Sequence, residues 1–193
     1  MLPLLIYFFT SIGGLIMCKL NYGQQKTLAV YETFFNQQYI ANCDNDQHTD
    51  EHIITQKMVY LLQVAGIPIG DYDFSWNFKG PFSPGLLANL RDIDRNSDEV
   101  EIFYAENHQN PILPKELKQE ILKIRAMLEL ERYKFCLLHW VELLGSLLYL
   151  SRSMLPGANY ELVNKKLMAY KNDYCNSDEN HRAWKALQAA NLL

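Results

Sequence analysis

The run His48-Thr49-Asp50-Glu51-His52 matches the H-x-x-E-H pattern of a class of zinc peptidases. In such enzymes two histidines one helical turn apart hold the zinc ion, and the glutamate is the general base. Here the run lies on a polar connection at the predicted start of a helix. Thr49 as the N-cap, with Asp50 and Glu51 in the first turn, already accounts for these residue types. We therefore predict no metal site and keep a zinc-dependent hydrolase as the weaker alternative.

A second pair of titratable residues, His139 and Glu142, lies three positions apart on one face of a predicted helix. Such a pair can act as a general base and the group that orients it. No nucleophile is identifiable beside the pair, so the spacing favours a satisfied polar pair or a contact with the following element. The chain also lacks a Walker loop, a G-x-G-x-x-G run and a G-x-S-x-G run. We predict a protein with no catalytic residues and no cofactor.

Composition bounds the class of protein further. The 193 residues are 49% hydrophobic and 21% charged, which is typical of one globular domain with a buried core. A net charge of -4 provides no basic field for phosphates, so nucleic acid is not the expected partner. The cysteines lie far apart without a C-x-x-C pair, which favours a reducing, cytoplasmic compartment, and Cys136 is expected to pack as a small hydrophobe in a helix.

Residues 1–18 form an apolar segment without a charged side chain. The segment lacks the basic region and cleavage site of a secretory signal and is shorter than the roughly 20 residues of a bilayer span. Three interpretations stay open: a membrane anchor, a start assigned too far upstream of Met17, or an apolar element packed on the body. We divide the chain into residues 1–18 and a single helical domain over residues 19–193, and expect membrane contact only through the former.

Apolar residues at three- and four-residue steps predict most of the secondary structure. The helix over 135–150 is apolar nearly all round except for His139, Glu142 and Ser146, which predicts a central helix with one narrow polar stripe. Further helices are expected over 27–41, 50–65, 84–91, 114–128, 159–167 and 178–190.

Two short segments follow a different pattern. Phe74, Trp76 and Phe78 alternate with polar residues, which indicates a strand, and residues 100–104 offer a second weak strand that could pair with it. The sequence therefore predicts a mainly α fold, a compact helical domain with a small β-hairpin or an extended aromatic segment.

The aromatic segment is the main candidate for binding. Its eleven positions from Tyr72 to Phe82 carry five aromatic residues, a density that is typical of either a core or an interface. A core role is the simpler interpretation. In an interface, however, Gly80-Pro81 would fix the shape of the loop and lower the entropic cost of binding.

The run Gln56-Lys57-Met58-Val59-Tyr60-Leu61-Leu62, followed by the aromatic strand and Gly80-Pro81-Phe82-Ser83, resembles SocA-like antitoxin proteins with the Panacea domain and their uncharacterised phage- and defence-associated relatives. The resemblance covers roughly residues 50 to 95. It implies a mainly helical fold with a small β element, no enzymatic activity, and neutralisation or delivery of a partner through protein contacts. The chain departs from the family at Ile54-Thr55, where a hydrophobic residue often precedes the Gln-Lys pair directly.

Our leading hypothesis is a cytoplasmic, non-catalytic component of a toxin-antitoxin or antiphage system that binds a toxin or defence effector. A winged-helix DNA-binding regulator is the main alternative, since short helices with a small hairpin can build that fold. The acidic charge of the chain opposes it. The residues expected to contact the protein partner are Tyr72, Phe74, Trp76, Phe78, Gly80, Pro81, Phe82 and Ser83.

Overall fold

The computed structural model describes residues 18–41, 50–130, 136–172 and 176–193. The expectations for residues 1–17, and those for His48 and Thr49, concern positions outside the described residues. In the part of the chain that is described, no helix is long and apolar enough to span a membrane.

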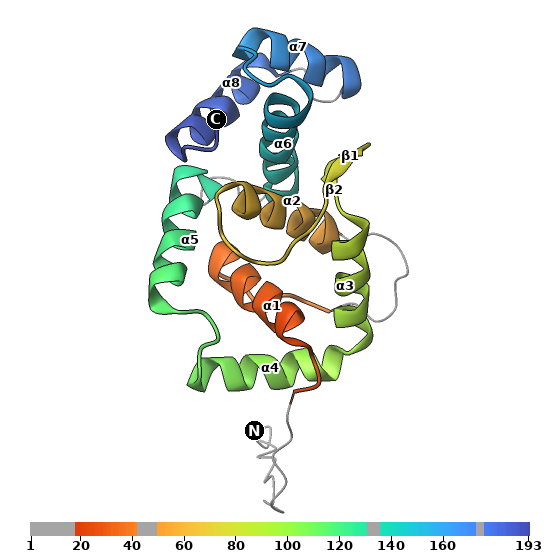
Figure 1. Ribbon diagram of the computed structural model, residues 1–193, viewed down its shortest axis with the longest axis vertical. Helices are drawn as coiled ribbons and strands as arrows, with labels where there is room; N and C mark the ends of the chain where they lie inside the picture. Colours follow the sequence, from red (N-terminus) through yellow and green to blue (C-terminus); the bar gives the residue numbers. More distant parts are fainter. Residues whose placement is uncertain (1–17, 42–49, 131–135, 173–175) are drawn as a thin grey trace, which may run out of the picture.

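The described residues fold into helices and one small antiparallel sheet, which confirms the predicted mainly α class. Figure 1 shows α4 across one end of the molecule, α7 and α8 at the other, and α1, α2 and α6 between them. In chain order the elements are α1 (Tyr22–Phe35), α2 (Asp50–Val64), β1 (Ser75–Asn77), β2 (Gly80–Phe82), α3 (Pro84–Arg95), α4 (Ser97–Gln109), α5 (Lys115–Met127), α6 (Leu137–Tyr149), the π-helical turn η2 (Leu150–Met154), α7 (Tyr160–Tyr170) and α8 (Ser177–Ala189).

The ends of several helices follow from side-chain capping. Ser83 and Asn159 accept hydrogen bonds from the backbone of the first turns of α3 and α7, which confirms two predicted starts. Helix α1 instead begins five residues before the predicted Thr27, because Asn21 and Gln24 form a reciprocal capping box. It ends at Asn36, whose backbone is left-handed (φ 56°), so the predicted extension to residue 41 is wrong.

The expected second strand over residues 100–104 is also wrong, because these residues lie in α4. Val100, Phe103, Tyr104 and Asn107 are buried at helical spacing, and acidic residues occupy the first turn. The period-two pattern covered too few residues to distinguish a strand from one face of a helix.

The sheet is a tight hairpin within the aromatic segment itself. Strand β1 pairs antiparallel with β2, so that Ser75 lies opposite Phe82 and Asn77 lies opposite Gly80. Phe78 and Lys79 form the two-residue loop between the strands. The predicted strand is therefore confirmed at Trp76, but its partner is the Gly80–Phe82 segment and not residues 100–104.

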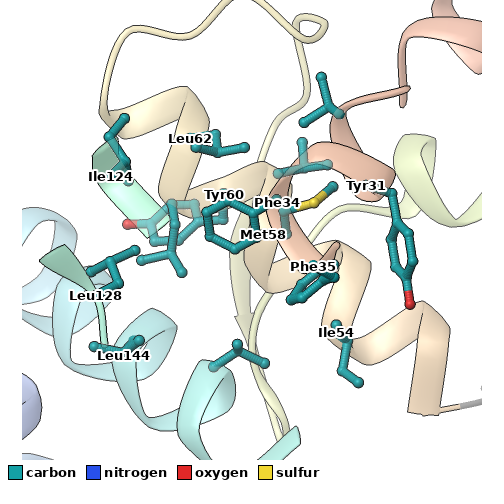
Figure 2. Packing of buried hydrophobic residues seen from close by; sticks show 14 of the residues in the cluster. Tyr31, Phe34, Phe35, Ile54, Met58, Tyr60, Leu62, Ile124, Leu128 and Leu144 are labelled. Atoms are coloured by element: carbon teal, nitrogen blue, oxygen red, sulfur yellow. The ribbon is translucent and has the colours of Figure 1, made fainter. Parts of the chain in front are cut away.

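The core is centred on α2 and α6, which make the most extensive contact of any two elements. Figure 2 shows Met58 and Tyr60 of α2 packed among side chains of α1, α5 and α6. Apart from its first turn, α6 is almost entirely buried, as predicted for a central helix. Cys136 precedes this helix and is exposed, so the prediction that it packs as a small hydrophobe is wrong.

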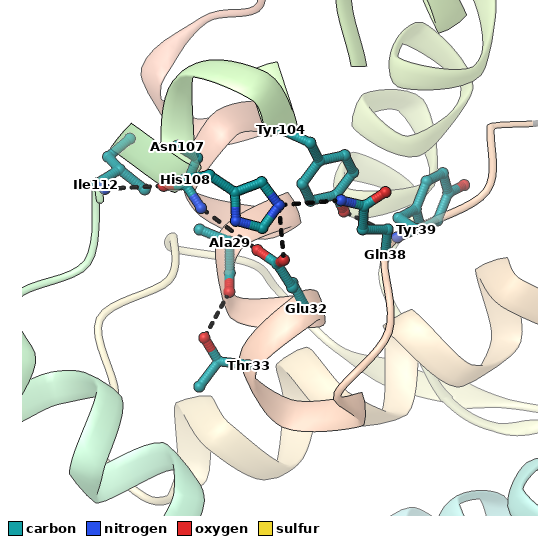
Figure 3. A network of polar contacts seen from close by, with 9 residues as sticks. All are labelled: Ala29, Glu32, Thr33, Gln38, Tyr39, Tyr104, Asn107, His108 and Ile112. Carbon is teal, nitrogen blue, oxygen red and sulfur yellow. Dashed lines mark hydrogen bonds and ion pairs between the residues drawn. The ribbon is translucent and has the colours of Figure 1, made fainter. Parts of the chain in front are cut away.

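A polar network ties α4 to α1, as Figure 3 shows. The amide of Asn107 donates to the Glu32 carboxylate (3.4 Å) and accepts from the backbone N–H of Ile112 (2.9 Å). The backbone N–H of Tyr39 donates to the Tyr104 hydroxyl (2.8 Å). These bonds satisfy polar groups at the edge of the core and hold α4 across α1.

Two glycines allow β2 to lie directly against α6. A Cβ atom at Gly145 of α6 would lie 3.3 Å from Cγ of Pro81, which is tighter than an ordinary van der Waals contact. Gly80 has φ +88°, and a Cβ there would lie 2.6 Å from Oγ of the buried Ser146. Gly80 therefore meets both a backbone and a packing requirement.

We expect Gly80→Ala to destabilise the fold by about 2–3 kcal/mol, since alanine would combine a left-handed backbone with a clash. Gly66→Ala is the matched control, because Gly66 has φ +83° but a Cβ atom there would meet nothing within 4 Å. It should cost about 1–2 kcal/mol from the backbone alone. Urea unfolding of both variants measures the difference, and equal costs would contradict the packing argument.

Candidate functional site

The structure places His52 in a buried contact rather than on an exposed helix start. Its Nε2 atom lies 2.7 Å from a carboxylate oxygen of Asp94 in α3, and the hydroxyl of Tyr39 donates to the other oxygen at 2.9 Å. Asp94 thus joins α3 to α2 and to the segment after α1. Among the described residues no cluster of three or more potential ligands is arranged to hold a metal ion. His48 of the H-x-x-E-H run lies outside them.

The two residues of the other titratable pair, His139 and Glu142, contact different partners. His139 Nε2 lies 3.2 Å from Glu179 of α8, while Glu142 forms a buried ion pair with Lys171 at the end of α7. Each residue therefore contacts a following element, which is one of the two structural roles expected from the sequence. These two contacts fix α7 and α8 on α6.

The aromatic hairpin is attached to α2 through the side chain of Gln56. Its amide N–H donates to the carbonyl of Ser83, and its amide oxygen accepts from the N–H of Ser83, both at 2.9 Å. Gln56 thereby pairs with the end of β2 in the way that a neighbouring strand would. Both residues are buried, so water does not compete with the two bonds.

The next residue, Lys57, also binds β2. Its Nζ atom donates to the carbonyl of Pro81 at 2.8 Å, and its side chain is only 1% exposed. Burial lowers the pKa of Lys57 to about 7; the attraction of Glu142 opposes this shift, and Lys171 and Lys79 add to it. Gln56 and Lys57 thus give the Gly80–Ser83 turn a structural role.

The remaining aromatic residues of the segment form a stack that leads from the core to the surface. Phe74 packs on Tyr60 of α2, and Trp76 packs between Tyr149 and Tyr170 with ring centroids 5.8 and 5.4 Å away. The Lys171 ammonium also lies 5.8 Å from the centroid of the Trp76 ring. Trp76 is therefore fixed by the ends of α6 and α7.

The tip of the hairpin is the most exposed part of the segment. Phe78 is 76% exposed, and its ring borders a hollow of about 390 Å³ that also contacts Leu138 and Tyr170. Lys79, His139 and the Glu142–Lys171 pair supply the polar part of the lining. The hollow thus combines an apolar wall with the buried Glu142–Lys171 ion pair.

The eight residues predicted to bind a partner fall into two groups. Gly80, Pro81 and Ser83 are buried against α2 and α6, whereas Tyr72, Phe74, Trp76 and Phe82 are partly buried and Phe78 is exposed. Sequence reasoning missed Leu138, Tyr170 and Lys171, which complete the hollow beside Phe78. The polar stripe of α6 predicted a central helix, but no local signal connected α6 or residue 171 with the hairpin.

Comparison with known proteins yields no match to this chain, either among protein-family models, among curated proteins or among solved structures.

We expect Gln56→Leu to lower the free energy of unfolding by about 2–4 kcal/mol, because it leaves the buried N–H of Ser83 without its acceptor. The carbonyl of Ser83 keeps a second donor, the N–H of Leu87. Gln63→Leu is the control, since Gln63 makes a single bond to the half-buried Tyr72 carbonyl and should cost about 1 kcal/mol. Similar losses in chemical denaturation of the two variants would contradict the strand-like role of Gln56.

The depressed pKa of Lys57 predicts a pH dependence of stability. The folded state releases the proton near pH 7, whereas the unfolded chain keeps it up to the ordinary lysine value of 10.5. Between these values the unfolded state binds more protons, so this group makes the protein more stable as the pH rises above about 7. Unfolding of the wild type and of Lys57→Met, followed from about pH 6 to pH 9, should show this rise only in the wild type. Parallel curves would contradict a buried ammonium.

Proposed function

We propose that this chain is a non-catalytic, cytoplasmic protein that binds a toxin or defence effector through the tip of its β1–β2 hairpin. The observation that carries the proposal is the position of Phe78. A large apolar ring, 76% exposed, lies at the tip of a hairpin whose base is held by Gln56 and Lys57. Leaving such a ring exposed gives up about 2 kcal/mol of hydrophobic stabilisation, and contact with a partner would restore it.

The attachment of the hairpin supports a binding role. Because Trp76 is packed between two tyrosines and Ser83 is fixed to α2, the loop with Phe78 has little freedom to lose when a partner docks. Side chains on a rigid support bind at a lower entropic cost than those on a flexible loop. The hollow beside Phe78 can receive one apolar side chain of the partner.

The sequence resemblance to SocA-like antitoxins supports the class of partner. The residues that carry the resemblance, Gln56, Lys57 and the Gly80–Ser83 turn, contact one another directly. The attachment of the hairpin to α2 therefore explains why these residues occur at this spacing. Such a unit could present different tip residues to different partners without a change in its base.

The test is affinity purification of the tagged chain, co-expressed with the genes that neighbour it, followed by mass spectrometry. We expect a stoichiometric protein partner to be recovered with the wild type and with the Tyr22→Ala control. It should be lost from the Phe78→Ala variant. Tyr22 is also exposed (65%) but lies at the start of α1. With the purified partner, Phe78→Ala should raise Kd at least about tenfold, or about 1.4 kcal/mol.

Two results would contradict the proposal. A partner that binds Phe78→Ala as tightly as wild type would exclude the hairpin tip as the contact. Recovery of the chain with DNA, released at higher salt, would favour the winged-helix regulator instead.

A further inference from the structure

A second hollow lies on the α2 side of the hairpin. It has a volume of about 270 Å³ and lies between the first half of α2 and the hairpin residues Asn77, Lys79 and Phe82. Lys79 borders both hollows, but Phe78 borders only the one described above. The second hollow is therefore a separate feature of the same hairpin.

The charges around this hollow are unbalanced. Lys57 and Lys79 line it, and none of its described lining residues is an aspartate or a glutamate. His52 also lines it, but the carboxylate of Asp94 faces its ring. Within the described residues, the hollow thus combines two amines with no acid in the lining, in a chain whose net charge is -4.

The ammonium of Lys57 is the group that most needs a counterion. It has three N–H donors, and the structure gives it one acceptor, the carbonyl of Pro81. The nearest strong attraction comes from Glu142, whose carboxylate is bound to Lys171. A buried cation with one neutral acceptor is costly, and an anion in the hollow would remove much of that cost.

The rest of the lining determines what kind of anion fits. Ile53 and Phe82 are half-buried and form an apolar wall, and Asn77 adds an amide that can donate or accept. The volume lies just below the roughly 300–1,000 Å³ of pockets for drug-sized ligands, which suits a molecule of about one ring. A phosphate alone would leave the apolar wall without contact.

We propose that this hollow binds an organic carboxylate with a short apolar body. The carboxylate accepts hydrogen bonds from Lys57 and attracts Lys79, and the apolar body packs against Ile53 and Phe82. Both a free carboxylic acid and the C-terminal carboxylate of a peptide have this chemistry. The inference does not depend on the proposed protein partner, because Phe78 does not line this hollow.

The test is isothermal titration calorimetry of the full chain with two matched pairs of probes. The first pair is 3-phenylpropanoate and 3-phenylpropanamide, which differ only in the charged group. The second pair is an acetylated tripeptide ending in phenylalanine, with a free or an amidated C-terminus. We expect at least one acid to bind about tenfold or more tightly than its amide. Binding of the free acid alone identifies a small molecule as the source, and binding of the peptide alone identifies a protein end.

Substitutions in this chain test whether the acid binds in this hollow. Lys57→Met should abolish the preference for the acid, and Lys79→Met, at an exposed position, should weaken binding of the acid about threefold to fivefold. Phe78→Ala removes the ring under Lys79 but leaves Lys57 in place, so it should keep the preference for acid over amide while it loses the protein partner. Because Lys57 must be protonated, the acid should also bind more tightly at about pH 6 than at about pH 8.5. Equal binding of acid and amide, or no binding of either pair, would overturn the proposal.

Discussion

The pairing of the Gln56 amide with Ser83 is the interaction on which the arrangement of the hairpin depends. A three-residue strand is too short to hold a hairpin in place, and β2 contains a proline that cannot donate a backbone hydrogen bond. Helix α2 supplies the missing bonds from two consecutive side chains, Gln56 and Lys57. The carbonyl of Pro81 and the backbone polar groups of Ser83 are thereby satisfied inside the core, where each would cost about 1–3 kcal/mol if left unpaired.

This attachment also determines which later elements reach the hairpin. With β2 held on α2, its other face lies against α6, and Trp76 extends to the ends of α6 and α7. The Glu142–Lys171 pair then fixes the end of α7 under the same ring. Both hollows beside the hairpin are consequences of this packing: one lies toward α2, and the other lies toward α6 and α7.

The sequence was sufficient to predict most of the helices, because periodic apolar residues and capping residues are local signals. The cap at Ser83 and the buried stripe of α6 are examples. Local signals failed where a contact between distant residues decided the outcome. The β2 strand could not be predicted, since its attachment to Gln56 joins residues 27 positions apart, and three alternating residues at 100–104 fit a strand as well as one face of α4. The sequence predicts Phe78 as a candidate contact residue, but Leu138, Tyr170 and Lys171 lie beside it through tertiary packing alone.

The contact between Gly145 and Pro81 has a consequence for how this protein can vary. At 3.3 Å from Cγ of Pro81, a methyl group on α6 would require the pyrrolidine ring to shift by a few tenths of an ångström. A larger residue at position 145 is therefore compatible only with a smaller residue, or a displaced strand, at position 81. In homologous sequences these two positions should change together, whereas Gly80 should stay glycine because its backbone has φ +88°. Substitutions that arise singly at these positions would be selected against because they lower stability, whereas Phe78 and Lys79 at the tip are exposed and free of this constraint.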